Sequence, residues 1–257
     1  MSVTTQIDGE VARITLDNPE KRNAFDDTII ASLTHAFEQA GRNDQVRVVV
    51  LQASGKHFSA GADLNWMRAM GQLDAQQNRE DALRLARLMQ SIDRCAKPVI
   101  ARVQGAAFGG ALGLICAADM AVAADNARFC LSEVKLGIIP AVISPYVVRA
   151  IGPRQARRYF MTAEVIPADR AMQLGIAHEV VPEAELDQAV DAMINALLAG
   201  GPQAQIETRD LVERVSTAPI DQAMLEDTAE RIARLRTGAE GQEGLSAFLE
   251  KRSPNWI

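Results

Sequence analysis

The 257-residue sequence contains few of the side chains that usually hold a metal or a nucleic acid. Aromatic residues make up only 4%, there are 3 histidines, and the 3 cysteines are far apart without a CxxC pair. The aromatic content is too low for a base-stacking surface, and these spacings match neither a disulfide framework nor zinc or haem ligation. We therefore expect no metal site, and we expect Cys95, Cys116 and Cys130 to be small buried apolar side chains.

The chain also lacks positive charge and long apolar runs. Lysine and arginine total 27 against 33 acidic residues, a net charge of -6, which disfavours a general nucleic-acid binder. The apolar runs are too short to span a bilayer, and residues 1–10 show no secretory signal pattern. We expect a cytoplasmic protein that binds neither nucleic acid nor membrane. With 48% hydrophobic and 23% charged residues, the chain can bury a substantial core.

Hydrophobic periodicity predicts strands separated by helices over the first 140 residues. Residues 3–16 alternate around Asp8-Gly9, which indicates two antiparallel strands. Further strands are expected at 46–52, 98–103, 120–123 and 127–134. Helices are expected from Asp26 or Asp27 to Ala40, at 75–94, and from the glycine-rich segment 105–113 to near Cys116. Beyond Pro140 only helical patterns follow, so the sequence predicts an α/β core with a helical extension.

Two segments of very small residues each follow a strand and open a helix. The first, 56–64, places Ser59-Ala60-Gly61-Ala62 before Asp63, and the second, 104–113, has glycines that do not form GxGxxG. Unpaired N–H groups at two such helix starts could bind one oxygen if the fold brings them together. An ordinary strand-to-helix turn is the alternative for the first segment. Ser59 does not match a GxSxG nucleophile motif.

Glu133 lies in an apolar stretch that ends in glycine and proline. A desolvated carboxylate there would have a raised pKa and could act as an acid or base. The alternative is a surface glutamate that pairs with Lys135 or caps a turn. Strand alternation would place Cys130, Ser132 and Val134 on one face and Leu131, Glu133 and Lys135 on the other.

These segments together resemble the crotonase family, also called the enoyl-CoA hydratase/isomerase superfamily. The similar segments are 18–25, 58–64, 103–110, 118–129, 133–140 and 248–256. The resemblance implies an α/β fold, a spiral of ββα units at 1–200, with a C-terminal helical trimerisation region at 201–257. It also implies an acyl-CoA substrate, coenzyme A as part of that substrate with no other cofactor, and a homotrimer or dimer of trimers.

Carried over by position, the N–H groups of Ala62 and Gly110 would bind the thioester oxygen. Glu133 matches one of two glutamates around the reacting water, but the second position is Gly113, which has no side chain. The expected activity is enoyl-CoA hydration. A site with a single carboxylate also resembles that of the family's isomerases, so isomerisation is a second hypothesis. The third hypothesis is a protein that binds an acyl-CoA without turnover.

The resemblance also implies residues for the coenzyme A part and a class of acyl group. The positions expected to contact coenzyme A are Lys21, Arg22, Ala60, Asp63, Leu64, Phe248 and Lys251. Residues 61–67 and 131–146 are similar to the methylglutaconyl-CoA and carboxygeranoyl-CoA hydratase branch, whose substrates carry a second carboxylate. Lys135 and Arg149 are candidate partners for such a carboxylate, although solvated surface charge is the more common role.

Overall fold

The computed structural model describes residues 2–257, which divide into two compact units. The first unit ends at Asp191 and the second is Ala192–Ile257, so the boundary falls inside helix α7 (Leu186–Leu198). The boundary expected from the sequence, between residues 200 and 201, lies just after that helix. None of the helices formed by residues 2–257 has the length and apolar character needed to cross a bilayer.

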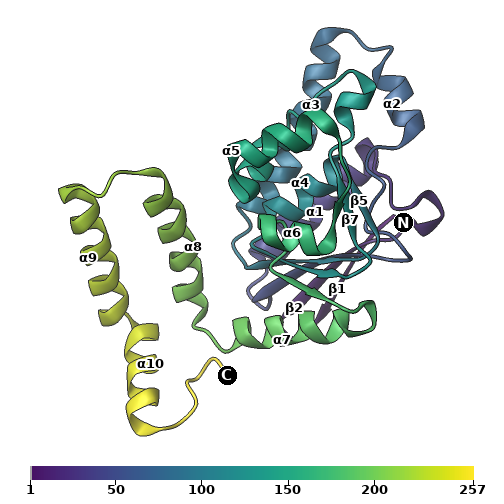
Figure 1. The fold of residues 1–257 in the computed structure, drawn as a ribbon. Coiled ribbons are helices and arrows are strands. Elements are labelled where there is room, and N and C mark those ends of the chain that lie inside the picture. The colour runs from purple at the N-terminus through teal and green to yellow at the C-terminus, as the bar shows by residue number, and fades with distance from the viewer. Residues whose placement is uncertain (1) are drawn as a thin grey trace. The chain divides into compact units, whose positions relative to one another are not determined.

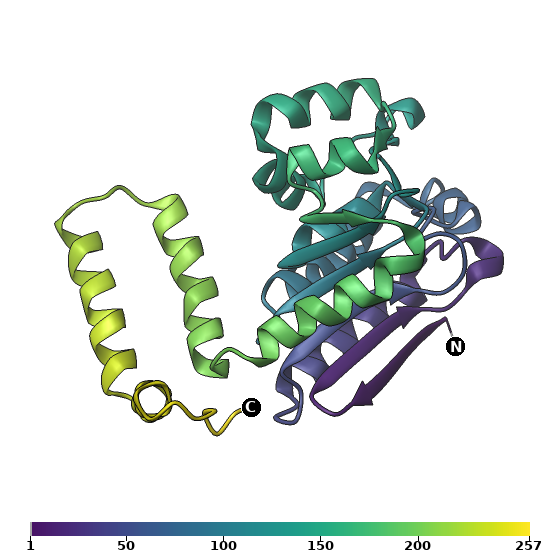
Figure 2. The same cartoon turned by 60° about the horizontal axis from the view of Figure 1, so that its bottom comes forward.

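A six-stranded sheet forms the centre of the first unit (Figure 1). Its strands, in spatial order, are β1 (Val3–Asp8), β2 (Val11–Leu16), β3 (Val48–Ala53), β4 (Val99–Val103), β6 (Met120–Ala124) and β9 (Glu179–Val181). The β1–β2 pair is antiparallel and the other neighbours are parallel. The predicted hairpin is confirmed, and it lies at one edge of the sheet (Figure 2).

The segments that follow the central strands pair with one another in a second, smaller layer. Strands β5 (Ala106–Phe108), β7 (Arg128–Cys130) and β8 (Ile166–Pro167) form a three-stranded sheet. Isolated bridges join Ser59 to Ala107 and Phe25 to Ala62, so the stretches after β2 and β3 also reach this layer. The repeat of central strand, extended segment and helix confirms the predicted α/β spiral of ββα units.

The helices of the first unit cover these layers with apolar faces. They are α1 (Asp27–Arg42), α2 (Leu64–Met70), α3 (Ala75–Asp93), α4 (Gly110–Ala117), α5 (Ser144–Thr162) and α6 (Ala168–Leu174), with short 3-10 turns at Pro19–Lys21, Glu133–Leu136 and Glu183–Glu185. In α1, Asp26 accepts a hydrogen bond from the N–H of Ile29, while Leu33 and Phe37 are buried. Burying a side chain such as Phe37 contributes about 1.5–3 kcal/mol.

Two secondary-structure predictions are wrong. The strand expected at 127–134 ends at Cys130, because its partners β5 and β8 have only three and two residues and offer no further backbone groups. Glu133 instead begins a 3-10 turn, so the proposed alternation of faces does not extend to it. Segments beyond Pro140 are not helical alone, since β8 and β9 are strands too short for a visible alternation.

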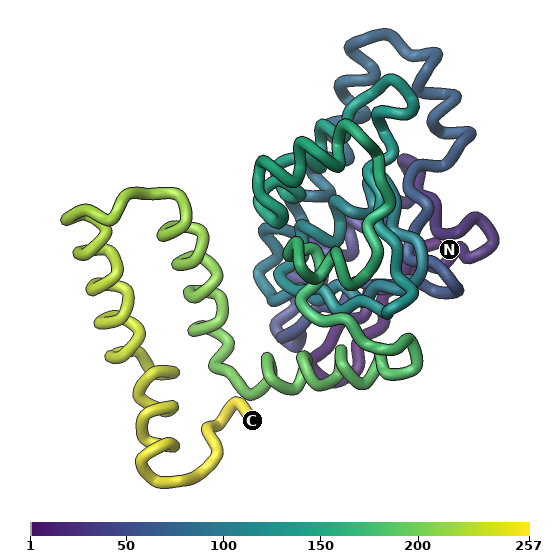
Figure 3. Tube along the Cα trace, in the orientation of Figure 1, coloured from purple at the N-terminus to yellow at the C-terminus, as the bar shows by residue number. Residues whose placement is uncertain are grey.

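The second unit contains three further helices, α8 (Pro202–Thr217), α9 (Gln222–Thr237) and α10 (Ala239–Glu250), which can be followed along the trace in Figure 3. The ion pairs Arg231–Asp210 at 2.9 Å and Arg234–Glu207 at 2.8 Å join α9 to α8. Glu240 accepts from two N–H groups of the first turn of α8. The predicted C-terminal helices are therefore confirmed.

Candidate active site

The two small-residue segments lie side by side in the second layer. The Ser59 N–H donates to the Ala106 carbonyl at 3.0 Å, and the Phe108 N–H donates back to the Ser59 carbonyl at 3.0 Å. Segments 58–61 and 104–109 therefore run in parallel and end at the same place. The sequence alone could not establish this meeting of the two helix starts.

Each helix start presents a free backbone N–H. The Phe25 N–H donates to the Gly61 carbonyl at 2.9 Å, and the Asp63 N–H donates to the Phe25 carbonyl at 3.0 Å. The N–H of Ala62, between these two residues, takes no part in this pairing. Gly110 is the first residue of α4, so its N–H has no helical acceptor. Within residues 2–257, neither the Ala62 nor the Gly110 N–H donates to another backbone group. Both N–H groups are therefore available to a ligand oxygen.

Close packing explains the small residues at this point. Gly61 has φ +90°, and a Cβ there would lie 2.8 Å from the Phe108 carbonyl oxygen. A Cβ on Gly110 would lie 2.7 Å from Cζ of the Phe25 ring. A side chain at Gly61 would therefore push apart two backbone segments, and one at Gly110 would force either the Phe25 ring or the start of α4 to move.

Glu133 lies beside the second helix start. A Cβ built on Gly109 would be 3.4 Å from Glu133 Oε1, while Oε2 is buried and has no hydrogen-bond partner in the part of the chain described. Burial raises the pKa of this half-buried carboxyl above its ordinary value, although a hydrogen bond from its own backbone lowers it. Lys135 does not pair with Glu133, because its Nζ donates to the Ala163 carbonyl at 3.1 Å. The carboxylate is therefore a candidate proton acceptor.

Gly113 faces a filled space. A Cβ on Gly113 would clash with Ile143, whose Cβ would be 2.7 Å away, and would lie 3.2 Å from Met89 Sδ. Gly113, Ile143 and Met89 are all buried. The apolar side chains of Ile143 and Met89 therefore occupy the volume beside the position expected for a second carboxylate.

The sequence matches the model of the enoyl-CoA hydratase/isomerase family over residues 6–257. The chain belongs to this family. A crystal structure of an enoyl-CoA hydratase from Shewanella pealeana is 51% identical, with a TM-score of 0.96, over 100% of this chain and 96% of that one. Two curated relatives are a 2,3-dehydroadipyl-CoA hydratase from Escherichia coli, 32% identical over 96% of this chain and 94% of its own, and a trans-2-decenoyl-[acyl-carrier-protein] isomerase from Streptococcus mutans, 30% identical over 97% and 95%.

Most of the residues expected to contact coenzyme A gather near the Ala62 helix start of this enoyl-CoA hydratase/isomerase family member. Lys21 Nζ lies 3.4 Å from an Asp63 carboxylate oxygen, and the Ala60 N–H donates to the Arg22 carbonyl at 2.9 Å. Asp63 also accepts from two N–H groups at the start of α2, and these backbone hydrogen bonds lower its pKa most, before Lys21. Leu64 is 76% exposed. Lys21 is thus partly neutralised by Asp63.

The other predicted residues are held by local partners or lie in the second unit. Arg149 forms an ion pair with Asp93 and lies over the Tyr146 ring at 5.6 Å from its centroid. In the second unit, Phe248 near the end of α10 is 80% exposed, and Lys251 follows the helix in a left-handed conformation with φ +55°.

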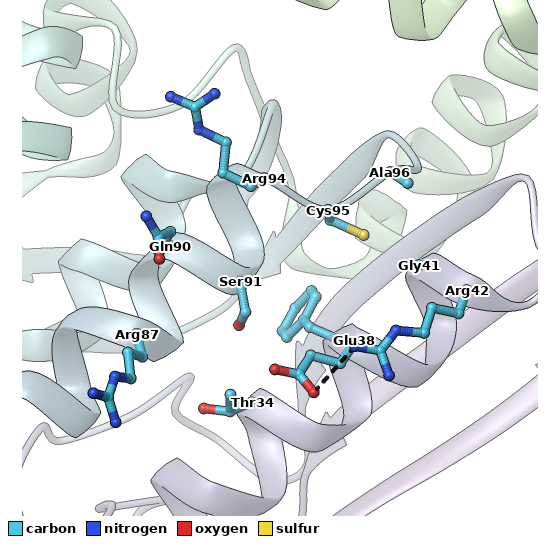
Figure 4. A pocket seen from close by; sticks show the side chains of 11 residues that line it. Thr34, Glu38, Gly41, Arg42, Arg87, Gln90, Ser91, Arg94, Cys95 and Ala96 are labelled. Atoms are coloured by element: carbon cyan, nitrogen blue, oxygen red, sulfur yellow. Dashed lines mark ion pairs between the residues drawn. The ribbon is translucent and has the colours of Figure 1, made fainter.

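A separate cavity of about 530 Å³ lies between α1 and α3 and contains none of the predicted site residues (Figure 4). Its hydroxyl groups donate to carbonyls of their own helices, Thr34 to Ile30 and Ser91 to Leu88, and Arg42 pairs with Glu38 at 3.9 Å. Residues 2–257 also contain no group of three or more His, Cys, Asp or Glu side chains arranged for a metal ion. All three cysteines are free and buried, as predicted.

Sequence reasoning missed two supporting features. Ile143 and Met89 are ordinary apolar residues far from Gly113 in sequence, so no local signal indicates their packing against it. The sequence pattern shows Ser59 only as one of several small residues and as a poor match to a nucleophile motif, yet Ser59 is fully buried and its hydroxyl donates to the Asn23 carbonyl at 2.7 Å. The one signal in the sequence was that Ser59 stands two residues before Gly61, a spacing at which a serine hydroxyl can accept from a backbone N–H.

Proposed function

We propose that this protein is an enoyl-CoA hydratase that adds water across the 2,3 double bond of a branched or dicarboxylic enoyl-CoA thioester. The observation that carries the proposal is the unpartnered, buried Oε2 of Glu133 beside the helix start that presents the Gly110 N–H. Family membership supplies the substrate class, and the site supplies the two functions that hydration needs, a donor pair for the thioester oxygen and a proton acceptor.

The two free N–H groups act on the thioester carbonyl. When water adds to C3 of a conjugated thioester, negative charge develops on the carbonyl oxygen. Hydrogen bonds from Ala62 and Gly110 would stabilise this charge more strongly than the ground-state carbonyl. Removal of one such donor typically costs about 2.7–4 kcal/mol of transition-state stabilisation.

Glu133 would carry the proton in both halves of the reaction. The Glu133 carboxylate accepts a proton from water as the water oxygen bonds to C3, and the carboxylic acid then returns that proton to C2 as the enolate collapses. One group can serve twice because accepting the first proton prepares it to donate the second. A pKa raised by burial makes the carboxylate a stronger base for the first step.

Two similarities support the proposed acyl class. Residues 61–67 and 131–146 are similar to the methylglutaconyl-CoA and carboxygeranoyl-CoA hydratase branch, and the Escherichia coli relative is named for a dehydroadipyl thioester. Lys135 donates to a backbone carbonyl and Arg149 pairs with Asp93, so each cation would have to leave its partner to bind a second substrate carboxylate.

A substrate panel tests the proposal. Purified protein would be incubated with short, long, branched and dicarboxylic 2-enoyl-CoA thioesters, and loss of the conjugated-thioester absorbance would be followed. Turnover should be fastest with a branched or dicarboxylic member. Absence of turnover with every member by a folded protein would reject hydration, and a preference for straight chains would reject only the acyl class.

Isomerisation of a 3-enoyl-CoA is the second candidate, and the packing at Gly113 favours it. Ile143 and Met89 leave no space for a second carboxylate there, and one carboxylate suffices to move a proton between C2 and C4. The Streptococcus mutans relative is named as an isomerase. Labelled water separates the candidates: hydration incorporates its oxygen into the product, whereas isomerisation forms the conjugated thioester without it.

We also propose that coenzyme A binds near Lys21, Arg22, Ala60, Asp63 and Leu64. In a homotrimer or dimer of trimers, Phe248 and Lys251 of each chain would reach the coenzyme A of a neighbouring subunit. Exposed apolar side chains in that unit support assembly: Ile206, Val212, Leu225, Ile232, Phe248 and Leu249 are each at least 46% exposed. Light scattering should give three or six times the 27.8 kDa chain mass, and a monomer would reject the assembly.

A further inference from the structure

Ser59 connects two loops at the first helix start through a hydroxyl group that solvent does not reach. The side chain is 0% exposed. Its Oγ donates to the Asn23 carbonyl at 2.7 Å and accepts from the Gly61 N–H at 3.0 Å. Both hydrogen bonds are buried, so water cannot readily replace either partner if the hydroxyl is removed.

The orientation of Gly61 determines where the Ala62 N–H points. The peptide between them is planar and trans, so the Ala62 N–H is directed opposite to the Gly61 carbonyl. That carbonyl accepts from the Phe25 N–H at 2.9 Å, and the Gly61 N–H is held by Ser59. Gly61 has φ +90°, which glycine adopts readily because it has no Cβ, and the same freedom means that contacts at both of its ends are needed to hold one orientation.

Asn23 makes the other end of this connection rigid. Its side chain donates to the carbonyls of Ser54 and His57, each at 2.8 Å, and accepts from the Asn18 N–H at 2.8 Å. Asn23 is 1% exposed and has φ +52°. The Ser59 hydroxyl is therefore anchored to a residue that three further hydrogen bonds hold in place.

We propose that Ser59 is a positioning residue that fixes the Gly61–Ala62 peptide so that the Ala62 N–H points at the thioester oxygen. The inference rests on the proposed function, because it requires the Ala62 N–H to act on that oxygen. Ser59 does not touch the substrate in this role, and it is not a nucleophile. Its hydroxyl proton is already donated to the Asn23 carbonyl.

Steady-state kinetics of Ser59→Ala provide the first test. We expect kcat on the best 2-enoyl-CoA to fall by about tenfold to a hundredfold, because the Ala62 N–H would be misaligned without being removed. We expect KM to change less than about threefold. The matched control is Ser91→Ala, which removes a hydroxyl that donates only to Leu88 in its own helix, and it should retain the wild-type kcat. A Ser59→Ala variant with unchanged kcat would overturn the proposal.

Infrared spectroscopy of the bound carbonyl separates positioning from general stability. In a Glu133→Gln background, in which we expect turnover to be at least about a hundredfold slower, a 2-enoyl-CoA with a labelled thioester carbonyl should show a stretch shifted to lower frequency on binding. Adding Ser59→Ala should reverse most of that shift, and Ser59→Cys, a weaker acceptor in the same place, should give an intermediate value if Ser59→Ala does not fold. If the shift is unchanged in these variants, the positioning role of Ser59 is overturned and the proposed function is not. If no shift is seen with Ser59 intact, the proposed oxyanion site itself is overturned.

Discussion

The packing of Gly113 against Ile143 predicts that replacing this helical glycine by alanine does not stabilise the protein, and that a larger, charged side chain destabilises it. In a helix interior, Gly→Ala normally stabilises by about 1 kcal/mol. Here the new Cβ would clash with Ile143 and lie 3.2 Å from Met89 Sδ, and overpacking of this kind costs about 1–3 kcal/mol. Gly113→Ala should therefore be neutral to about 2 kcal/mol less stable.

Gly113→Glu should be considerably worse, because it also buries a carboxylate among apolar side chains. We expect a loss of about 3 kcal/mol or more, which corresponds to a fall in Tm of about 6–12 °C for a chain of this size. Urea unfolding followed by circular dichroism would measure both variants. A Gly113→Glu protein as stable as wild type would refute the packing argument and show that a second carboxylate fits.

Substitutions at Ile143 test the identity of the clashing atoms. The Ile143 atom nearest to a Cβ at position 113 is the methyl carbon Cγ2. Ile143→Leu removes Cγ2 with little change in side-chain volume, whereas Ile143→Val retains Cγ2 and is the matched control. Combined with Gly113→Ala, Ile143→Leu should recover about 0.5–3 kcal/mol of coupling energy, and Ile143→Val should recover none. Equal effects of the two substitutions would show that the clash is elsewhere.

Two further predictions concern the proton acceptor and the second donor. Because burial raises the pKa of Glu133, kcat/KM should fall as the pH is lowered through a value above the ordinary 4.5. The buried carboxylate is costly once ionised, so the wild type should lose stability relative to Glu133→Gln as the pH rises through the same window. Differences in rate and stability that do not depend on pH would contradict the raised pKa. Gly110→Ala would place Cβ 2.7 Å from the Phe25 ring and should lower kcat by about tenfold or more, whereas Gly71→Ala, with its nearest contact at 3.5 Å, should not; equal rates would contradict the role of Gly110.

Local sequence signals were sufficient for elements that are stabilised locally. Asp8-Gly9 indicated the hairpin, and the apolar face of α1 with Asp26 before it indicated a capped helix. The strand β9 was missed because three residues, Glu179–Val181, become a strand only by pairing with β6. The end of β7 was missed because it depends on the length of its partners and not on its own sequence.

The chemistry of the site could be predicted to the level of residue types. The two small-residue segments and the carboxylate of Glu133 were identified from the residue pattern, the family resemblance singled out Ala62 and Gly110 within those segments, and the structure brings the two segments together. The surroundings of Gly113 and the hydrogen bonds of the Ser59 hydroxyl depend on tertiary contacts, and the hydroxyl bond from Ser59 to Asn23 joins residues 36 positions apart. No periodicity within either segment reports such contacts.

The turnover of Glu133→Gln tests the central claim most directly, that one carboxylate carries the proton. We expect kcat on the best 2-enoyl-CoA to fall by at least about a hundredfold, while calorimetry shows unchanged affinity for a saturated acyl-CoA. Glu38→Gln, at an exposed carboxylate, is the control and should retain wild-type turnover. A Glu133→Gln rate within about threefold of wild type would contradict the claim and leave Glu133 without a role in proton transfer.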